Sequence, residues 1–186
     1  MIVLGVDPGT IVTGYGLVES QNGRVSVLAS GCIRNDGRTS MPLRLKRIFD
    51  TLSEVIARHH PDEFAIETAF YGKNAQSALK LGHARGVAML AAVSREIPTQ
   101  EYSPREVKKA IVGNGTASKE QVQYMVRVLL KLKKSPVQYD TTDALAVAMC
   151  HIHRRLAVHR SPSGSWKSYI GAHPEKIVPV PRPPRR

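Results

Sequence analysis

The chain has 186 residues, and its 27 Lys and Arg against 15 Asp and Glu give a formal net charge of +12. A hydrophobic content of 42% suffices for a packed core at that length, and the basic excess favours a polyanionic partner, with nucleic acid as the leading class. No apolar stretch of about 18 residues, basic amphipathic helix or signal-type start points to a membrane. Cys32 and Cys150 have neither disulfide-framework nor zinc-site spacing, so a cytoplasmic location is expected.

Three strands are predicted at the N-terminus, at residues 2–6, 14–20 and 24–33. The first is a continuous apolar run, which is typical of a buried strand, and it ends at the turn-forming residues Asp7-Pro8-Gly9. The pair Asn22-Gly23 favours a tight hairpin between the second and third strands. The N-terminal part is therefore expected to form an antiparallel three-stranded unit.

Helices and strands alternate through the rest of the chain. The pattern predicts, in order, a helix over 42–59, a strand over 64–66, a helix over 75–95, a strand over 98–102, a short helix from Pro104, a helix from 118 to about 132, and a last helix from about 140. Pro104 suits the first turn of its helix, and Ser118 can cap the next one. The helix over 75–95 is apolar on more than one side, which suits either a dimer element or a central helix covering the sheet.

Residues 158–186 differ in composition from the rest of the chain. From residue 151 to the C-terminus there are 8 basic side chains and 1 acidic side chain, and the last residues are rich in proline. We interpret 1–157 as one globular domain and 158–186 as a disordered basic tail. Such a tail can contact DNA phosphates or simply remain solvated, and the sequence leaves both alternatives open.

Four carboxylates stand at the ends of predicted elements. Asp7 and Glu67 each end a strand, and Asp140 and Asp143 begin the last helix, on one face of its first turn. Because like charges cannot all stay ionised in a low-dielectric site without a compensating cation, the group predicts a metal site. Hard oxygen ligands select Mg²⁺ or Mn²⁺ over Zn²⁺. Two such ions about 4 Å apart can activate water and stabilise the leaving oxygen of a phosphodiester, so the group indicates a nuclease.

The alternative, purely structural interpretation differs from one carboxylate to the next. Asp140 can serve as the N-cap of the helix that it begins. The turn after Asp7 also resembles the phosphate-binding loop of actin-like and sugar-kinase ATPases, but those need two lobes and a second Asp-x-Gly turn, which this chain does not show. Glu67 is the hardest to explain structurally, because Glu has low strand propensity and its burial is costly.

Six short motifs occur in a characteristic order: Asp7-Pro8-Gly9-Thr10 with Thr13-Gly14-Tyr15-Gly16, Phe64-Ala65-Ile66-Glu67, Lys73-Asn74-Ala75, Ala78-Leu79-Lys80-Leu81-Gly82, Ala84-Arg85-Gly86, and Asp140-x-x-Asp143-Ala144-Leu145. Together they resemble the RuvC family of Holliday-junction resolvases over about residues 1–157. The resemblance implies an RNase H-like α/β fold with a central mixed five-stranded sheet flanked by helices on both faces. It also implies a homodimer that cuts four-way DNA junctions.

The resemblance also implies roles for individual residues. The catalytic and metal-binding acids are Asp7, Glu67, Asp140 and Asp143, with two Mg²⁺ per subunit sharing Asp7 and with Mn²⁺ as a substitute. Phe70 corresponds to an aromatic residue that contacts bases near the crossover, and Lys108 and Lys119 correspond to basic residues near the scissile strand. The alternatives are a core role for Phe70 and plain solvation for the two lysines. A four-way junction and a branch-migration motor of the RuvA and RuvB type are the implied partners.

Three competing functions follow from the same residues. A nuclease of this fold can act on another nucleic acid, such as an RNA–DNA hybrid. A junction-binding module can recruit a motor without cutting, although loss of a catalytic acid would favour that reading and none is lost. A small-molecule phosphohydrolase or ATPase is disfavoured by the charge of +12. The leading hypothesis is symmetric cleavage of junction strands of like polarity, giving 5′-phosphate ends and ligatable nicks in DNA recombination and repair.

Overall fold

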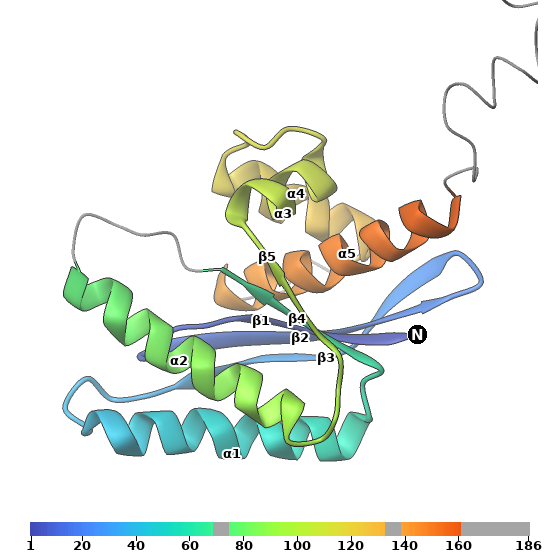
Figure 1. Ribbon diagram of the computed structural model, residues 1–186. Helices are drawn as coiled ribbons and strands as arrows, with labels where there is room; N and C mark the ends of the chain where they lie inside the picture. The colour runs from blue at the N-terminus through green and yellow to red at the C-terminus, as the bar shows by residue number, and fades with distance from the viewer. Residues whose placement is uncertain (69–74, 133–138, 161–186) are drawn as a thin grey trace, which may run out of the picture. The chain divides into compact units, whose positions relative to one another are not determined.

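A mixed five-stranded sheet lies between two layers of helices in the computed structural model, which describes residues 1–68, 75–132 and 139–160. The strand order is β3-β2-β1-β4-β5. Helices α1 and α2 cover one face of the sheet, and α3, α4 and α5 lie on the other (Figure 1). The predicted α/β fold with a mixed sheet and helices on both faces is confirmed.

The first three strands form an antiparallel meander, and the last two run parallel to β1. Their bounds are Ile2–Asp7 (β1), Val12–Gln21 (β2), Arg24–Arg34 (β3), Glu63–Glu67 (β4) and Thr99–Tyr102 (β5). Asn22 and Gly23 both have positive φ, 51° and 75°, as a two-residue hairpin turn requires. The hairpin predicted from this pair is therefore confirmed.

Five helices occur in the described residues: Met41–His59 (α1), Ala75–Val93 (α2), Pro104–Val112 (α3), Lys119–Leu129 (α4) and Tyr139–Arg160 (α5). Ser103 and Ser118 each begin a complete capping box, whose reciprocal partners are Glu106 and Gln121. These boxes fix where α3 and α4 begin, and the second one places Lys119 at the first helical position of α4. The predicted starts at Pro104 and after Ser118 agree with the structure.

The sheet buries both of its faces, because β1 and β4 are apolar at successive positions. On β1 and β4 the even-numbered side chains, such as Leu4 and Phe64, pack with α1 and α2. The odd-numbered ones, such as Val3 and Ala65, pack with the helices of the opposite face. Since side chains alternate along a strand, every odd-numbered residue of β1 and β4 faces α5.

Some expectations concern residues outside the described ranges. Phe70 lies in 69–74 and the residues beyond 160 follow the end of α5, so their predicted roles stay predictions. Met1–Arg155 forms one compact unit, and α5 continues to Arg160. Helix α2 ends at Val93, two residues before the predicted end. None of the helices in the described residues is long and apolar enough to cross a membrane.

Candidate active site

Asp7 and Glu67 come together because they end neighbouring parallel strands. Asp7 is the last residue of β1 and Glu67 the last residue of β4, and the two strands pair in parallel from Val3 and Glu63 onward. The carboxyl ends of parallel neighbours lie at the same edge of a sheet, and both residues occupy the α5-facing register. Strand pairing and pleat alone therefore place two carboxylates on one face at one edge.

The turn that follows Asp7 is fixed by side-chain hydrogen bonds. The buried Thr13 hydroxyl donates to the Gly9 carbonyl over 2.6 Å and accepts from the Gly9 N–H over 3.2 Å. The Asn35 amide donates to the Thr10 carbonyl over 3.1 Å, which connects the end of β3 to the same turn. These bonds hold the end of β1 rigidly, so the position of Asp7 is well determined.

Helix α5 supplies the remaining carboxylates, and three glycines let it lie unusually close to the sheet. A Cβ on Gly5 would meet the backbone of Ala144 and Ala148, and one on Gly16 would lie 2.6 Å from Leu145 Cδ2. A Cβ on Gly14 would lie 2.7 Å from the Asp140 carbonyl carbon and nearer still to its oxygen. Real Cβ atoms do not approach other atoms so closely.

The glycines on β1 and β2 are therefore what allow the first turn of α5 to approach the strand ends. With side chains at these positions, the helix that carries Asp140 and Asp143 would stand farther from Asp7 and Glu67. Each glycine lies in a strand, where its conformational freedom weakens the local structure. Their presence is explained by the close approach of the helix backbone and not by a turn.

A cavity of about 320 Å³ opens at this edge of the sheet. Its lining residues are Asp7, Glu67, Pro104, Val107, Lys108, Lys119, Val122, Asp143 and Ala146. The ammonium of Lys119 lies 2.6 Å from Asp143 Oδ2, with the Lys119 side chain 55% exposed and that of Asp143 16% exposed. Three acids and two lysines from α3, α4, α5 and two strands thus share one open cavity.

Burial and mutual repulsion disfavour the ionised form of the acids in the cavity. Burial, followed by the charge of Asp143, raises the pKa of Asp7 to about 7. Burial, followed by the charges of Asp7 and Asp143, raises the pKa of Glu67 to about 7. The pKa of Asp143 is also raised by burial, although its hydrogen bond with Lys119 opposes this. The same contact raises the pKa of Lys119. For Asp7 and Glu67, burial and the repulsion between the acids therefore outweigh the attraction of the nearby lysines.

The predicted site residues that fall within the described ranges take part to different degrees. Asp7, Glu67, Asp143, Lys108 and Lys119 line the cavity. One turn before Asp143, Asp140 is not among the lining residues, but its charge raises the pKa of Asp7.

The donor set fits a divalent cation in chemistry, since it consists of carboxylate oxygens. As the side chains stand, no three His, Cys, Asp or Glu groups in the described residues converge closely enough to hold one ion. Asp143 Oδ2 is engaged by Lys119. Asp143 would therefore have to give up this contact before that oxygen could bind a cation.

Comparisons with known proteins identify the family of the chain. The family model described as "Crossover junction endodeoxyribonuclease RuvC" matches residues 3–151. The chain belongs to the RuvC family. The RuvC of Salinibacter ruber is 45% identical over 177 residues, 95% of this chain and 99% of the relative. The RuvC of Shewanella sp. (strain MR-4) is 55% identical over 152 residues, 82% of this chain and 87% of the relative.

A solved RuvC structure has the same architecture. The T. thermophilus RuvC in complex with a Holliday junction substrate has a TM-score of 0.80 and 33% sequence identity, and the match covers 85% of this chain and 96% of that one. As a member of the RuvC family, the chain is a crossover junction endodeoxyribonuclease, a hydrolase, and the family implies dependence on a divalent metal.

Sequence reasoning named the acids that line the cavity, but not the features that position them. The roles of Thr13 in the turn and of Gly5, Gly14 and Gly16 under α5 depend on which segment lies above them. Gly14 and Gly16 stand in one of the motifs that carried the resemblance, yet nothing local tells which helix they admit. Glycines at alternate positions of a strand are the one signal that could have indicated a close backbone approach.

Proposed function

We propose that this chain resolves four-way DNA junctions by hydrolysing one phosphodiester in each of two strands of like polarity, leaving 5′-phosphate ends and ligatable nicks. The observation that carries the proposal is the cavity in which Asp7, Glu67 and Asp143 meet beside Lys108 and Lys119. Carboxylates alone would repel a phosphate, and lysines alone would bind it without cutting. Their combination in one open cavity suits binding and hydrolysis of a phosphodiester.

Asp7, Glu67, Asp140 and Asp143 are proposed to hold two Mg²⁺ per subunit, with Mn²⁺ as a substitute. The support is electrostatic: burial and mutual repulsion raise the pKa of Asp7 and that of Glu67 to about 7, and a divalent cation would relieve that repulsion. When bound, such ions activate a water and stabilise the leaving oxygen. Asp7, on the strand nearest the middle of the sheet, is proposed to be shared between the ions.

Lys108 and Lys119 are proposed to bind the phosphates beside the cut. Lys119 has a mostly exposed side chain at the first position of α4, where the helix N-terminus also favours anions. Its bond to Asp143 engages an oxygen that a metal ligand would need. In this proposal Asp143 would exchange its contact with Lys119 for a metal ion, which would leave the Lys119 ammonium available to bind the phosphate. Phe70 remains proposed as the residue that contacts bases near the crossover.

A homodimer is proposed to place two such sites on one junction. The exposed face of α2 carries Leu79, Leu90 and Val93, which are 63%, 55% and 56% exposed. On this helix they lie along one stripe, and Gly82 and Gly86 between them have open space where a Cβ would stand. An apolar stripe with small residues suits a second copy of α2. A two-fold dimer would then offer equivalent sites to a two-fold junction.

The remaining partner and location hypotheses rest on the family alone. A branch-migration motor of the RuvA and RuvB type is proposed as a partner, and a cytoplasmic location remains a prediction. The basic residues 158–186 are proposed to assist DNA binding through phosphate contacts.

The proposal is tested with a labelled immobile four-way junction, a linear duplex and an RNA–DNA hybrid, each with and without Mg²⁺. Paired, symmetric nicks confined to the junction and dependent on Mg²⁺ are expected. Asp7→Asn should abolish the nicks and keep junction binding, whereas Asp50→Asn, which alters an exposed acid paired with Lys46 on α1, should cut normally. Cutting by Asp7→Asn would refute the metal assignment. Junction binding by the unaltered protein without nicks would favour a recruiting module.

A further inference from the structure

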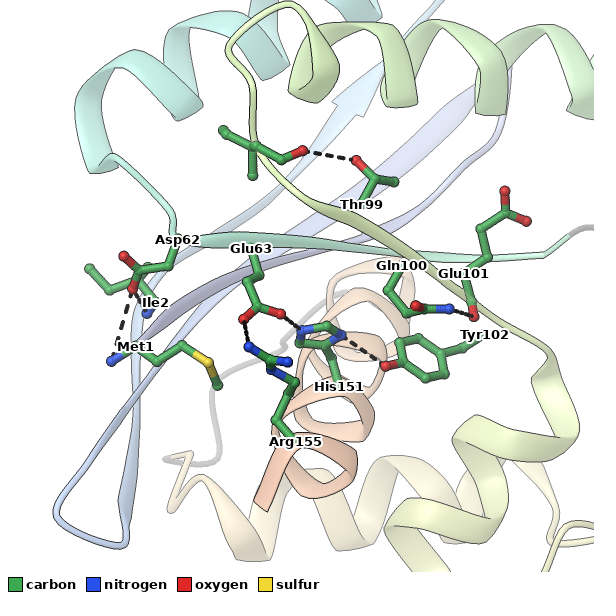
Figure 2. A network of polar contacts seen from close by, with 11 residues as sticks. Met1, Ile2, Asp62, Glu63, Thr99, Gln100, Glu101, Tyr102, His151 and Arg155 are labelled. Atoms are coloured by element: carbon green, nitrogen blue, oxygen red, sulfur yellow. Dashed lines mark hydrogen bonds and ion pairs between the residues drawn. The ribbon is translucent and has the colours of Figure 1, made fainter. Parts of the chain in front are cut away.

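A largely buried polar network joins the first residue of β4, the last residue of β5 and the middle of α5, about two turns beyond Asp143 (Figure 2). His151 of α5, which is 3% exposed, bonds through Nε2 to Glu63 Oε2 and through Nδ1 to the Tyr102 hydroxyl, the latter over 2.8 Å. Arg155, one turn farther along α5, lies 2.8 Å from Glu63 Oε1. Figure 2 shows Glu63 between His151 and Arg155, with Tyr102 on the other side of the imidazole. We call Glu63, Tyr102 and His151 the clamp.

The clamp satisfies the hydrogen-bonding capacity of its buried groups. A carboxylate can only accept, so His151 Nε2–H donates to Glu63, and in the neutral imidazole Nδ1 accepts from the Tyr102 O–H. Each bond has a defined direction. His151 and Tyr102 are buried and the Glu63 side chain is 15% exposed, so replacing one partner leaves a largely buried group unsatisfied. The clamp therefore resists sliding of α5 along β4, which apolar contacts alone would tolerate more readily.

The clamp and the catalytic acids are joined by the same two elements. Glu63 and Glu67 begin and end β4 on the same face, about 13 Å apart at the usual rise of a strand. Asp143 and His151 lie on one face of α5, about 12 Å apart at the usual rise of a helix. Ala65 lies halfway between Glu63 and Glu67, Val147 lies halfway between Asp143 and His151, and both belong to one buried cluster.

These spacings mean that β4 and α5 lie side by side with two matched pairs of residues. One pair is Glu63 with His151, which are hydrogen-bonded. The other pair is Glu67 with Asp143, which line the same cavity. Because the distance between the two pairs is nearly the same along β4 and along α5, fixing the position of His151 relative to Glu63 also sets the position of Asp143 relative to Glu67. A slip of α5 by one residue would move Asp143 by about 1.5 Å relative to Glu67.

We propose that the clamp is a positioning device for the active site: Glu63, Tyr102 and His151 fix the axial register of α5 on β4 and thereby the separation of Glu67 and Asp143. The inference rests on the proposed function, because it assigns those acids to the metal ions. His151 touches neither substrate nor metal and acts only through the helix that carries Asp143. Misplacement of a reacting group by about 1 Å can cost on the order of a hundredfold in rate. The cleavage rate should therefore depend on the register of α5 on β4.

The test compares His151→Leu, Glu63→Gln and Tyr102→Phe in the full-length protein. Leucine fills much of the space of His151 but makes neither bond. Mn²⁺ affinity measured by titration calorimetry should fall about tenfold in His151→Leu, the lower end of what loss of a group supporting metal ligands costs. Single-turnover cleavage at saturating junction should fall by a similar or larger factor, and junction affinity in Ca²⁺ should not change.

The two conservative variants separate positioning from simple loss of stability. Glu63→Gln keeps an oxygen that accepts from His151, so it should retain near-normal Mn²⁺ affinity. Tyr102→Phe removes one hydroxyl and should weaken Mn²⁺ binding about threefold, since it loses one of the two hydrogen bonds. Because Tyr102→Phe is a mild change, it keeps the proposal testable even if His151→Leu does not fold.

Leu52→Ala is the matched control, because it destabilises the core between α1 and the opposite face of the sheet. It should leave Mn²⁺ affinity and the single-turnover rate unchanged while lowering the urea midpoint. Unchanged Mn²⁺ affinity and rate in folded His151→Leu or Tyr102→Phe would overturn the positioning role. Asp7→Asn separates failure of the proposed function from failure of the positioning role. If Asp7→Asn still binds Mn²⁺ and cuts, the proposed function is wrong. If Asp7→Asn is inactive but the clamp variants bind Mn²⁺ and cut normally, only the positioning role is wrong.

Discussion

Substitution of Gly14 by alanine should damage both catalysis and stability. The added Cβ would stand 2.7 Å from the Asp140 carbonyl carbon and closer to its oxygen. Ordinary carbon contacts are about 3.5 to 4.0 Å, so the first turn of α5 has to retreat by roughly 1 Å. Such overpacking typically costs about 1 to 3 kcal/mol of unfolding free energy, whereas a 1 Å displacement of catalytic groups can reduce the rate about a hundredfold.

The assay for Gly14→Ala is single-turnover cleavage of a labelled junction, alongside urea unfolding. Gly37→Ala is the control, because a Cβ there meets nothing within 4 Å and φ is not positive. We expect Gly14→Ala to cut about a hundredfold more slowly at saturating Mg²⁺, and Gly37→Ala to cut normally. A normal rate in folded Gly14→Ala would refute the argument that the close approach of α5 to the sheet sets the active-site geometry.

Three further predictions concern charge and assembly. Because folding raises the pKa of Asp7 and that of Glu67 from their ordinary values of 3.8 and 4.5 to about 7, the metal-free unfolding free energy should fall as pH rises from about 4 to about 7. Asp7→Asn should flatten this profile in urea titrations, and an unchanged profile would contradict the assigned burial. Leu90→Glu should convert a dimer to a monomer in sedimentation experiments, and an unaltered dimer would exclude this face of α2. Lys119→Met should tighten Mn²⁺ binding, because Asp143 loses its competing cation, yet slow cleavage; weaker Mn²⁺ binding would refute the competition.

The secondary structure could be predicted from local signals because those signals were strong. The Asn22-Gly23 pair marked a hairpin, and Ser118 marked a helix start that the structure completes with a capping box. Apolar runs that end in Asp7 and Glu67 indicated strands delivering acids to a sheet edge. These features depend on only a few consecutive residues, so the sequence sufficed for them.

The devices that position the site could not be predicted, because they depend on contacts between distant residues. His151 bonds to Glu63, 88 residues away, and to Tyr102, 49 residues away. In the sequence it is one of three histidines in the last helix, and a histidine in such a helix more often is merely a satisfied core residue. From the sequence alone, Gly14 is only a residue that weakens a strand. Its role becomes clear once the structure shows the Asp140 backbone packed against it.

Two independent constraints place α5: Gly14 sets its distance from the sheet near Asp140, and the clamp at His151 sets its position along β4. The two lie about 16 Å apart along the helix, and they share no contact partner. If they act independently, the losses of transition-state stabilisation in Gly14→Ala and His151→Leu should add to within about 0.5 kcal/mol in the double variant. If α5 instead moves as one rigid body, either substitution alone would already displace the whole helix. The double variant would then lose much less than the sum in the cleavage assay, and the separation into two constraints would be wrong.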